Sequence, residues 1–567
     1  MLRQFKDFFT SYCVDGYIVP KNDKYFAEYS YPNRLYNISK FSGSAGFAII
    51  LKNTNYLFVD GRYTTQAKIE SGTNFKIIEI PYSYPYDLFK NFKTKLRIGF
   101  DPKLFTNKML EIYFKNTCSL IPINENLVDK LFSEKGTKKI SYFYNIKKKY
   151  SGESISSKIN RLLKILKKNK IDNIFISGSE NVAWLLNIRG KDNPNSPIPN
   201  CKIILTKKKQ IYLFTNTVKI KKINNLKEYK KINFLEEKDI YLIISKLSGK
   251  NFCIDSLTCS IFYQSLIKSR FKITNNNDPC YYLKSIKNKT EINNTKKAHI
   301  HDGVALTKFL YWIKHHSLKN LDEKKAEKKL EYFRKKNKFY LYPSFNTIMG
   351  SGPNSAIIHY RSNEKTNRKI NKKDILLCDS GGQYKYGTTD VTRTICFDKP
   401  KNNIKNIFTR VLKGHIAVIK TNLNKVKKGN LIDKKARYWL NKIGLDYGHG
   451  TGHGVGFFLN VHEGPQALSK YNNIELKSGM ILSNEPGFYK EKHFGIRIEN
   501  LIYISKLKKD LIFKNLTFAP IDKDLIDYSM LDKKEKIYLS QYNSETYLKI
   551  SKYLNKNEKK WLVKLIN

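Results

Sequence analysis

Three of the ten histidines in this chain lie close together, in the stretch GHGTGHGVGFFLNVHEGP at positions 448–465. Six glycines share that stretch, so its backbone can pass close to a crowded site. All ten histidines fall between residues 299 and 493. Core packing does not require this concentration, and histidine is the side chain that ligates metals and moves protons near neutral pH. We therefore expect the chemistry of this protein in the second half of the chain.

Two aspartates lie in DILLCDSGGQYKYGTTDVTRTICF, residues 374–397. Asp379 ends one strand-like run and Asp390 begins the next, and a turn rich in Gly and Tyr separates them. A hairpin would bring the two carboxylates side by side. Such a pair repels unless one member is protonated or a divalent cation binds both. The alternative is that both residues only flank turns, where Asp is common.

Two glutamates follow in strand-like segments. GMILSNEPGFY, residues 479–489, is apolar up to Glu485 and is broken by the next residue, a proline. FGIRIENLIYI, residues 494–504, alternates with period two, which predicts Arg497 and Glu499 on one face and isoleucines on the other. A glutamate on such a strand needs a partner, and Arg497 and a metal ion are the two candidates.

His453 adds one imidazole to these four carboxylates. The candidate metal ligands are Asp379, Asp390, His453, Glu485 and Glu499. This set suits two divalent ions about 3.5 to 4 Å apart that share a water molecule. The metals would lower the pKa of that water and polarise a carbonyl group, so the predicted reaction is hydrolysis. His449 and His462 are then left to bind substrate or to donate protons.

These motifs, together with IIHYRS around His359, occur in one order along the chain: IIHYRS, LLCDSGGQYKYGTTDVTRT, GHGTGHGVGFFLNVHEGP, SNEPGFY and FGIRIEN. In them the chain resembles the aminopeptidase P group of the pita-bread metallopeptidases, family M24, in its long three-domain cytosolic form. The upstream segments SGSAG, VDGRY and NVAWLLNIRG resemble the two creatinase-like domains of that form. The resemblance thus covers most of the chain.

The resemblance implies an activity and roles for individual residues. It implies two manganese ions on the five ligands and removal of the first residue of a peptide when the second is proline. His359, His449 and His462 match substrate-binding and proton-handling histidines, Tyr489 matches a substrate-binding residue, and Arg497 matches an arginine beside the metal glutamate. Without the resemblance, His359 in the strand-like AIIHY is equally compatible with a core histidine.

A dedicated enzyme for this bond has a physical reason. The bond to a proline nitrogen is a tertiary amide without N–H, and the ring fixes φ, so peptidases that grip the backbone there bind it poorly. Our hypothesis is that hydroxide held by the metals attacks the carbonyl of the first residue. Glu485 would shuttle the proton, and the histidines would stabilise the oxyanion and hold the proline.

Length and patterning predict several domains of mixed α/β (α+β) class. A chain of 567 residues exceeds what one core usually supports. Short apolar runs alternate with turn residues in the first part, and a lysine-rich join lies near residues 133–150. With the resemblance, we expect two creatinase-like N-terminal domains, a pita-bread catalytic domain and its C-terminal extension. The expected boundaries are 1–145, 146–292, 293–515 and 516–567.

Other activities fit parts of the same pattern. A prolidase, which cleaves only dipeptides, uses the same five ligands. Methionine aminopeptidase also shares them but usually lacks two long upstream domains. A third alternative is a non-catalytic pita-bread module, in which the positive charge would become nucleic-acid affinity. Retention of all five ligands argues against that module.

The net charge is +55, from 104 basic and 49 acidic side chains, and a polyanion partner is one interpretation. Lysines are spread through every region without a groove-reading motif, and Lys, Asn, Ile, Tyr and Phe are all encoded by A/T-rich codons. We favour composition bias and expect no specific nucleic acid.

The remaining features predict a cytoplasmic protein. No apolar run is long enough to span a bilayer, and the first residues show no secretory signal. The eight cysteines form no CxxC pair, which argues against a disulfide framework. The resemblance further implies a homodimer and peptide substrates.

Overall fold

The computed structural model describes residues 2–28, 32–132 and 140–566. The chain forms two compact units. The N-terminal unit contains residues 1–148 and 153–281, and the C-terminal unit contains residues 149–152 and 282–567. Part of the lysine-rich join expected near residues 133–150 lies outside the described residues.

The N-terminal unit contains two six-stranded sheets. The first has the strand order β4-β3-β2-β1-β5-β6 and the second has the order β12-β11-β10-β8-β13-β14. The strands of the first are β1 Gly16–Pro20, β2 Phe47–Leu51, β3 Asn55–Asp60, β4 Lys76–Ile80, β5 Arg97–Phe100 and β6 Ser119–Pro122. Those of the second are β8 Asn173–Ile176, β10 Lys202–Thr206, β11 Ile211–Phe214, β12 Ile232–Leu235, β13 Asn251–Ile254 and β14 Lys272–Asn275.

The two sheets have the same topology. In each, a central strand (β1 or β8) pairs antiparallel with one neighbour and parallel with the other. The outer pairs also correspond, because β3 with β4 and β11 with β12 are both parallel. The helices of this unit are α1 Leu2–Ser11, α2 Arg34–Ser39, α3 Thr64–Ser71, α4 Pro85–Phe89, α5 Asn107–Phe114, α6 Leu127–Leu131, α8 Ile155–Lys168, α9 Ser179–Leu185, α10 Ile240–Lys246 and α11 Ile261–Lys268.

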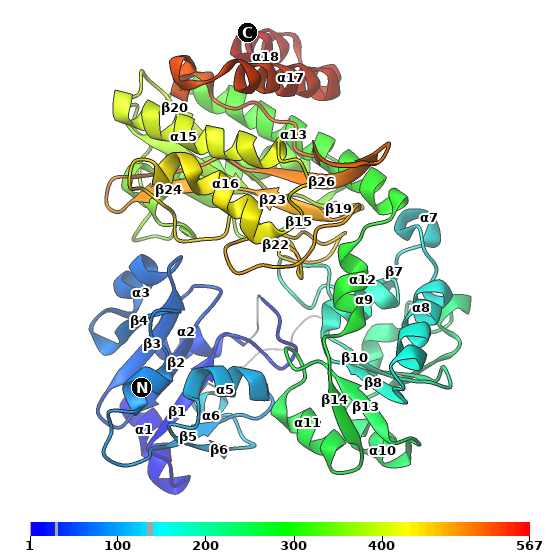
Figure 1. The fold of residues 1–567 in the computed structure, drawn as a ribbon. Coiled ribbons are helices and arrows are strands. Elements are labelled where there is room, and N and C mark those ends of the chain that lie inside the picture. Colours follow the sequence, from blue (N-terminus) through cyan, green and yellow to red (C-terminus); the bar gives the residue numbers. More distant parts are fainter. Residues whose placement is uncertain (1, 29–31, 133–139, 567) are drawn as a thin grey trace. The chain divides into compact units, whose positions relative to one another are not determined.

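The C-terminal unit is built from short sheets and long helices (Figure 1). Its central strands are β15 Tyr340–Pro343, β16 Ile348–Ser351, β17 Ile375–Ser380, β18 Gly382–Tyr384, β19 Gly387–Thr388, β20 Val391–Cys396, β21 Gly452–His453, β22 Ala467–Leu468, β23 Ile481–Asn484, β24 Gly487–Lys490, β25 Phe494–Arg497, β26 Asn500–Leu507 and β27 Asp510–Asn515. Its helices are α13 Lys289–His315, α14 Glu323–Lys335, α15 Asn402–Ile419, α16 Gly429–Asn441, α17 Lys533–Ile550 and α18 Lys556–Ile566. Helix α12 (Pro279–Ser285) crosses the boundary between the units.

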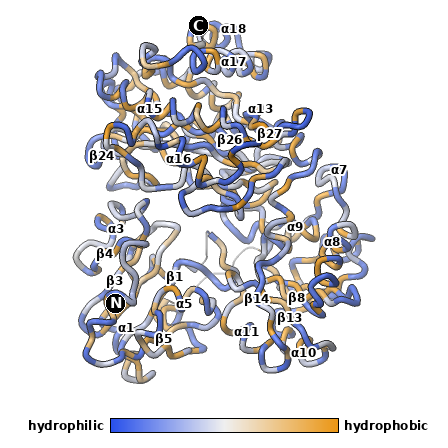
Figure 2. Tube along the Cα trace, viewed as in Figure 1, coloured by the Kyte–Doolittle hydropathy of each residue, from blue (hydrophilic) through white to orange (hydrophobic). Residues whose placement is uncertain are grey.

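Helices pack on both sides of these strands. One core cluster joins Leu306 and Phe309 of α13 to Leu376 of β17. Another joins Val418 of α15 to Leu482 of β23. In Figure 1 the yellow helices α15 and α16 cover the orange strands β23 and β26, and Figure 2 shows hydrophobic and hydrophilic residues alternating along these helices. One apolar stripe per helix is the pattern expected of a helix packed on a sheet.

A buried ion pair supports the end of β17, where Asp379 lies. Arg334 of α14 donates to both carboxylate oxygens of Asp302 on α13, at 2.8 and 3.2 Å, and to the hydroxyl of Ser380 at 3.0 Å. The hydroxyl of Tyr384 donates to the same aspartate at 2.8 Å. The side chains of the ion pair are 1% and 4% exposed. One buried ion pair therefore connects α13, α14 and the end of β17.

Replacing Asp302 by Ala should lower the free energy of unfolding by about 3 to 5 kcal/mol, because Arg334 would become a buried unpaired cation. Denaturant unfolding followed by tryptophan fluorescence measures this, since Trp312, Trp439 and Trp561 make up three of the four tryptophans and all lie in the C-terminal unit.

The matched control is the exposed ion pair between Lys427 and Glu475, whose side chains are 44% and 55% exposed. Glu475→Ala should change the free energy of unfolding by at most about 1 kcal/mol. Equal effects of Asp302→Ala and Glu475→Ala would contradict the role given to the buried pair.

Candidate metal centre

Two paired strands bring the aspartates of the centre together. Asp379 is the fifth residue of β17, and Asp390 immediately precedes β20. The strands pair antiparallel, with Ser380 opposite Val391. Ligand atoms of Asp379, Asp390 and Glu499 all lie within 4.8 Å of one another. The hairpin β18–β19 occupies the connection and pairs with β15, so it does not separate the aspartates.

His453 and Glu485 come from a second pair of elements. His453 ends β21, and Glu485 directly follows β23. A Cβ on Gly452 would lie only 2.0 Å from the carbonyl oxygen of Ser483, so only glycine allows β21 to approach β23 this closely. The hydroxyl of Ser483 accepts from the backbone N–H of His453 at 2.9 Å. Ligand atoms of His453, Glu485 and Glu499 also lie within 4.8 Å of one another.

The tautomer of His453 is set by its own loop. Its Nδ1 lies 2.9 Å from the carbonyl oxygen of Gly454, which can only accept, so Nδ1 carries the proton. The lone pair of Nε2 then faces Asp390 Oδ2 at 3.4 Å and Glu485 Oε1 at 3.6 Å. With its proton on Nδ1, the ring cannot donate from Nε2 to either carboxylate. The two separations are close to the distance of about 3 to 3.5 Å between two ligands that each lie about 2.1 Å from one ion.

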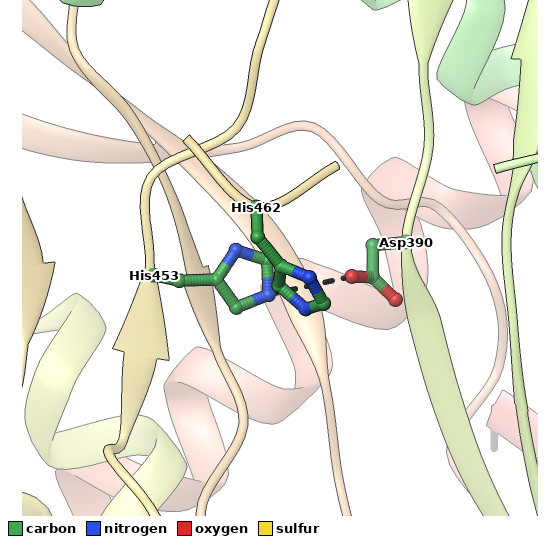
Figure 3. A group of neighbouring side chains, drawn as sticks. All are labelled: Asp390, His453 and His462. Atoms are coloured by element: carbon green, nitrogen blue, oxygen red, sulfur yellow. Dashed lines mark ion pairs between the residues drawn. The ribbon is translucent and has the colours of Figure 1, made fainter. Parts of the chain in front are cut away.

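His462 lies against this group. Its ring centroid is 4.4 Å from that of His453, at an angle of 73°. Ligand atoms of Asp390, His453 and His462 are within 4.8 Å of one another. Figure 3 shows both imidazole rings facing the carboxylate of Asp390. His462 is therefore close enough to exchange a proton with anything bound at the centre.

The carboxylates repel one another and are short of partners. Burial and the neighbouring carboxylates raise the pKa of Asp390 and of Glu499 well above their usual values, and burial raises the pKa of Glu485. Within the described part of the chain, Asp379 Oδ1 and Glu499 Oε1 are buried without a hydrogen-bond partner. A divalent cation would relieve both the repulsion and the missing contacts, so the donor set fits metal ions.

Arg497 is the cation of this cluster. Its Nη2 donates to Asp379 Oδ2 at 2.5 Å, and its Nε donates to the hydroxyl of Thr392 at 3.2 Å. That hydroxyl in turn donates to Glu499 Oε2 at 2.8 Å. The sequence offered Arg497 as a direct partner of Glu499, but its ion pair is with Asp379, and it reaches the glutamate only through Thr392.

The reason is a break in the expected strand. Residues 494–504 do not form one strand, because β25 ends at Arg497 and β26 begins at Asn500. The backbone N–H of Glu499 donates to the carbonyl of Thr392 at 3.2 Å instead of continuing the ladder of β25 with β24. Both faces of the segment are also buried, since Ile496, Ile498, Arg497 and Glu499 are at most 2% exposed.

A chain of hydrogen bonds runs from Arg497 to His449. Arg497 Nη1 donates to the hydroxyl of Tyr489 at 2.5 Å, and that hydroxyl lies 2.9 Å from Nε2 of His449. Nδ1 of His449 donates to the carbonyl of Gly450 at 2.8 Å, so the hydroxyl of Tyr489 donates to Nε2 when the ring is neutral. Burial raises the pKa of Tyr489, which keeps this donor protonated.

His359 does not lie in a strand. It follows the short helix at Gly352–Ala356, in a turn, and is half-buried. The strand-like interpretation of AIIHY is therefore wrong. The preceding residue, Ile358, offers its carbonyl to Arg497 Nη2 at 3.5 Å, which places this turn beside the arginine.

Comparison with known proteins supplies the family. A model of metallopeptidase family M24 matches residues 293–506, and one of the C-terminal region of that peptidase matches residues 510–566. Creatinase/prolidase N-terminal domain models match residues 2–131 and 135–291. A probable Xaa-Pro aminopeptidase P of Laccaria bicolor is 36% identical over 98% of this chain and 90% of its own length. The chain belongs to metallopeptidase family M24.

Further relatives agree with this assignment. The Xaa-Pro aminopeptidase ApepP of Drosophila melanogaster is 35% identical over 96% of this chain and 93% of its own. The crystal structure of an X-prolyl aminopeptidase from Caenorhabditis elegans, described as a cytosolic enzyme with a di-nuclear active site, superposes with a TM-score of 0.92. It is 28% identical and covers 100% of this chain and 98% of its own.

The family membership confirms the predicted fold class and enzyme class. The M24 protein has two creatinase-like N-terminal domains followed by a pita-bread domain, and it is a metal-dependent hydrolase. Thr392, which joins Arg497 to Glu499, was not among the residues predicted from the sequence. Its signal was present, because period two along β20 places Thr392 on the same face as Asp390.

Removing divalent metal should lower the Tm of this M24 protein, because the carboxylates then repel one another without compensation. Adding Mn²⁺ to stripped protein should raise the Tm again. At a Mn²⁺ concentration 100 times the dissociation constant, each site should add about 2.7 kcal/mol to the free energy of unfolding. Differential scanning fluorimetry and a metal count by mass spectrometry measure the two effects.

Asp390→Asn should bind fewer ions and show a smaller rise in Tm. The control is Asp374→Asn, which alters a carboxylate whose ion pair is with Arg368 at 2.9 Å. An identical Tm with and without metal in the unaltered protein would contradict the metal centre.

Proposed function

We propose that this M24 protein is an Xaa-Pro aminopeptidase, which removes the first residue from peptides with proline in second position. The observation that carries the proposal is the buried group of four carboxylates and His453, joined through Arg497 and Tyr489 to His449. The relatives named as Xaa-Pro aminopeptidases match over nearly the whole chain.

Prolidase is the second candidate, and the solved structure that matches this chain over its whole length favours the aminopeptidase. The prolidase of Pyrococcus horikoshii is 26% identical with a TM-score of 0.53, but it covers only 64% of this chain. The aminopeptidase of Caenorhabditis elegans covers all of it. The match over the whole chain thus favours the aminopeptidase.

We propose that two divalent ions bind here, on Asp379, Asp390, His453, Glu485 and Glu499. Mn²⁺ is the proposed metal, because oxygen-rich sites suit such hard cations. When bound, the ions lower the pKa of a water molecule and polarise the carbonyl of the scissile bond. The similarity to the Caenorhabditis elegans enzyme, which has a di-nuclear active site, supports the number of ions.

Glu485 is the proposed proton carrier. Its side chain is 18% exposed, whereas Asp390 and Glu499 are buried more completely. The proline nitrogen leaves as an amine, so it must gain a proton as the bond breaks. Glu485 takes a proton from the attacking water and delivers it to that nitrogen.

The histidines and Tyr489 hold the substrate. Arg497 fixes the hydroxyl of Tyr489, and that hydroxyl orients the ring of His449. We infer that His462 donates a hydrogen bond to the oxyanion formed during attack, since donors fixed in a buried site stabilise such charge best. His449 joins it only when its ring is protonated and its Nε2–H turns from the hydroxyl of Tyr489 to the substrate. The proposed role of His359, contact with the proline residue, is supported by its motif and by the position of its turn beside Arg497.

Domain limits, location and assembly are also proposals. The family models at 2–131, 135–291, 293–506 and 510–566 support domains at 1–145, 146–292, 293–515 and 516–567. Among the described residues, no helix has the length and apolar character needed to cross a membrane. We infer a cytoplasmic homodimer without a specific nucleic-acid partner, in which the excess of lysine reflects codon composition.

The proposed activity is tested with three peptides and metal-stripped protein given Mn²⁺. We expect release of arginine from Arg-Pro-Pro and none from Arg-Ala-Ala, because only the first has the tertiary amide. The dipeptide Ala-Pro should be cleaved poorly. Cleavage of Ala-Pro alone would identify a prolidase, and no cleavage of any peptide by metal-loaded protein would reject both.

Glu485→Gln should lower kcat on Arg-Pro-Pro by a factor on the order of 10² to 10⁴, because the amide cannot carry the proton. The assay is run at saturating Mn²⁺ with the ions per chain counted, because Glu485 is also a proposed ligand. Glu491→Gln, on an exposed residue between β24 and β25, is the control. Full activity with two ions in Glu485→Gln would overturn the assignment.

A further inference from the structure

Helix α16 carries an ion pair that also grips the loop containing His449. Asp433 and Arg437 lie one turn apart, and Arg437 donates to both carboxylate oxygens, at 2.8 and 3.2 Å. Asp433 is 1% exposed. Pairs at this spacing usually stabilise only their own helix, by a few tenths of a kcal/mol. Here both side chains have further partners outside it.

The guanidinium of Arg437 binds two carbonyls of residues 446–451. Its Nη1 donates to the carbonyl of Tyr447 at 2.8 Å, and its Nη2 donates to the carbonyl of His449 at 2.5 Å. The group also lies 4.0 Å from the ring centroid of Tyr447 and donates to Asp446. The planar fork of arginine can hold two such acceptors at once, which the single amine of lysine cannot do with the same geometry.

The carboxylate of Asp433 holds the other end of the loop. Its Oδ1 accepts from the backbone N–H of Thr451 at 3.1 Å and from the hydroxyl of Thr451 at 2.6 Å. The carbonyl of Thr451 accepts the backbone N–H of Glu485 at 2.8 Å. One pair of side chains thus brackets His449 on both sides and connects to the backbone of Glu485.

We propose that Asp433 and Arg437 are positioning residues for His449. This inference rests on the proposed function, in which His449 acts on the substrate. Gly448 and Gly450 flank the histidine, and glycine leaves the backbone free to sample many conformations. The pair removes that freedom and sets the imidazole against the hydroxyl of Tyr489.

A purely structural role would instead stabilise the fold and affect every activity alike. A double-mutant cycle on kcat/KM for Arg-Pro-Pro separates the two roles. Arg437→Met should lower kcat/KM about 100-fold, the effect of misplacing a reacting group by about 1 Å, and mainly through kcat. In a His449→Ala background the same change should cost less than about threefold, because the group being positioned is gone. Equal costs in both backgrounds would overturn the proposal.

Two further variants distinguish misplacement of His449 from a general loss of folding. Arg437→Lys can still reach one carbonyl and should recover part of the activity lost in Arg437→Met. Asp433→Asn keeps the shape and an acceptor for Thr451 and should cost about tenfold. Arg410→Met is the control, because Arg410 is also half-buried and donates to a backbone carbonyl, that of Trp439 at 3.0 Å, outside the loop. It should leave kcat/KM unchanged.

A measurement independent of activity completes the test. In the full-length protein loaded with diamagnetic Zn²⁺ and labelled with ¹³C at histidine, the signal of His449 is identified by its loss in His449→Ala. Arg437→Met should shift or broaden this signal, and Arg410→Met should not. An unchanged His449 signal would overturn the proposal. If the unaltered protein cleaved no Xaa-Pro peptide, the proposed function would fail and this signal alone would decide the role of Arg437.

Discussion

Four carboxylates meet in the interior of the C-terminal unit, and their mutual repulsion is the constraint around which the rest of that unit is arranged. Asp379, Asp390 and Glu499 are at most 7% exposed, so water cannot screen them. Arg497 is the permanently charged cation that pairs with a carboxylate of the group, that of Asp379. The repulsion destabilises the fold when no metal is bound, and binding of divalent cations relieves it. Metal binding and the stability of this unit are therefore coupled.

The surrounding structure holds the carboxylates where they would not otherwise stay. Helices α13 and α14 support the end of β17 through Asp302 and Arg334, and Thr392 bridges Arg497 to Glu499. Each of these groups is buried, so each hydrogen bond replaces a lost contact with water. These hydrogen bonds orient the ligands, as the partners behind metal ligands commonly do.

The edge of the centre differs from its interior. His449 lies on a glycine-rich loop, and its orientation comes from hydrogen bonds that reach it from Tyr489 and from the backbone of its own loop. Loops that carry reactive groups are commonly more mobile than the elements behind them, so their precision must come from outside contacts. Helix α16 provides those contacts with two side chains one turn apart.

Particular residues show how far local patterns reach. The strand-like run that ends at Asp379 and the one that begins at Asp390 predicted two strands, and the structure pairs them. The strand predicted over residues 494–504 was wrong in one respect, because it breaks at Glu499 where the backbone turns to pair with Thr392. Local alternation does not reveal such a break, since apolar residues continue to alternate from β25 across Glu499 into β26. The common topology of the two N-terminal sheets was equally invisible, because many sequences satisfy one pattern of buried strands.

The sequence by itself determined which residue types gather in this protein. Glycines, histidines and carboxylates in an ordered set of motifs were sufficient to predict a hydrolytic metal centre and the family. Only the tertiary structure decided the partners: Arg497 pairs with Asp379, Thr392 links that arginine to Glu499, and Arg437 binds the carbonyl of His449. The physical reason is that these contacts join residues 12 to 118 positions apart, and their geometry depends on how strands and helices pack rather than on any neighbour in the chain.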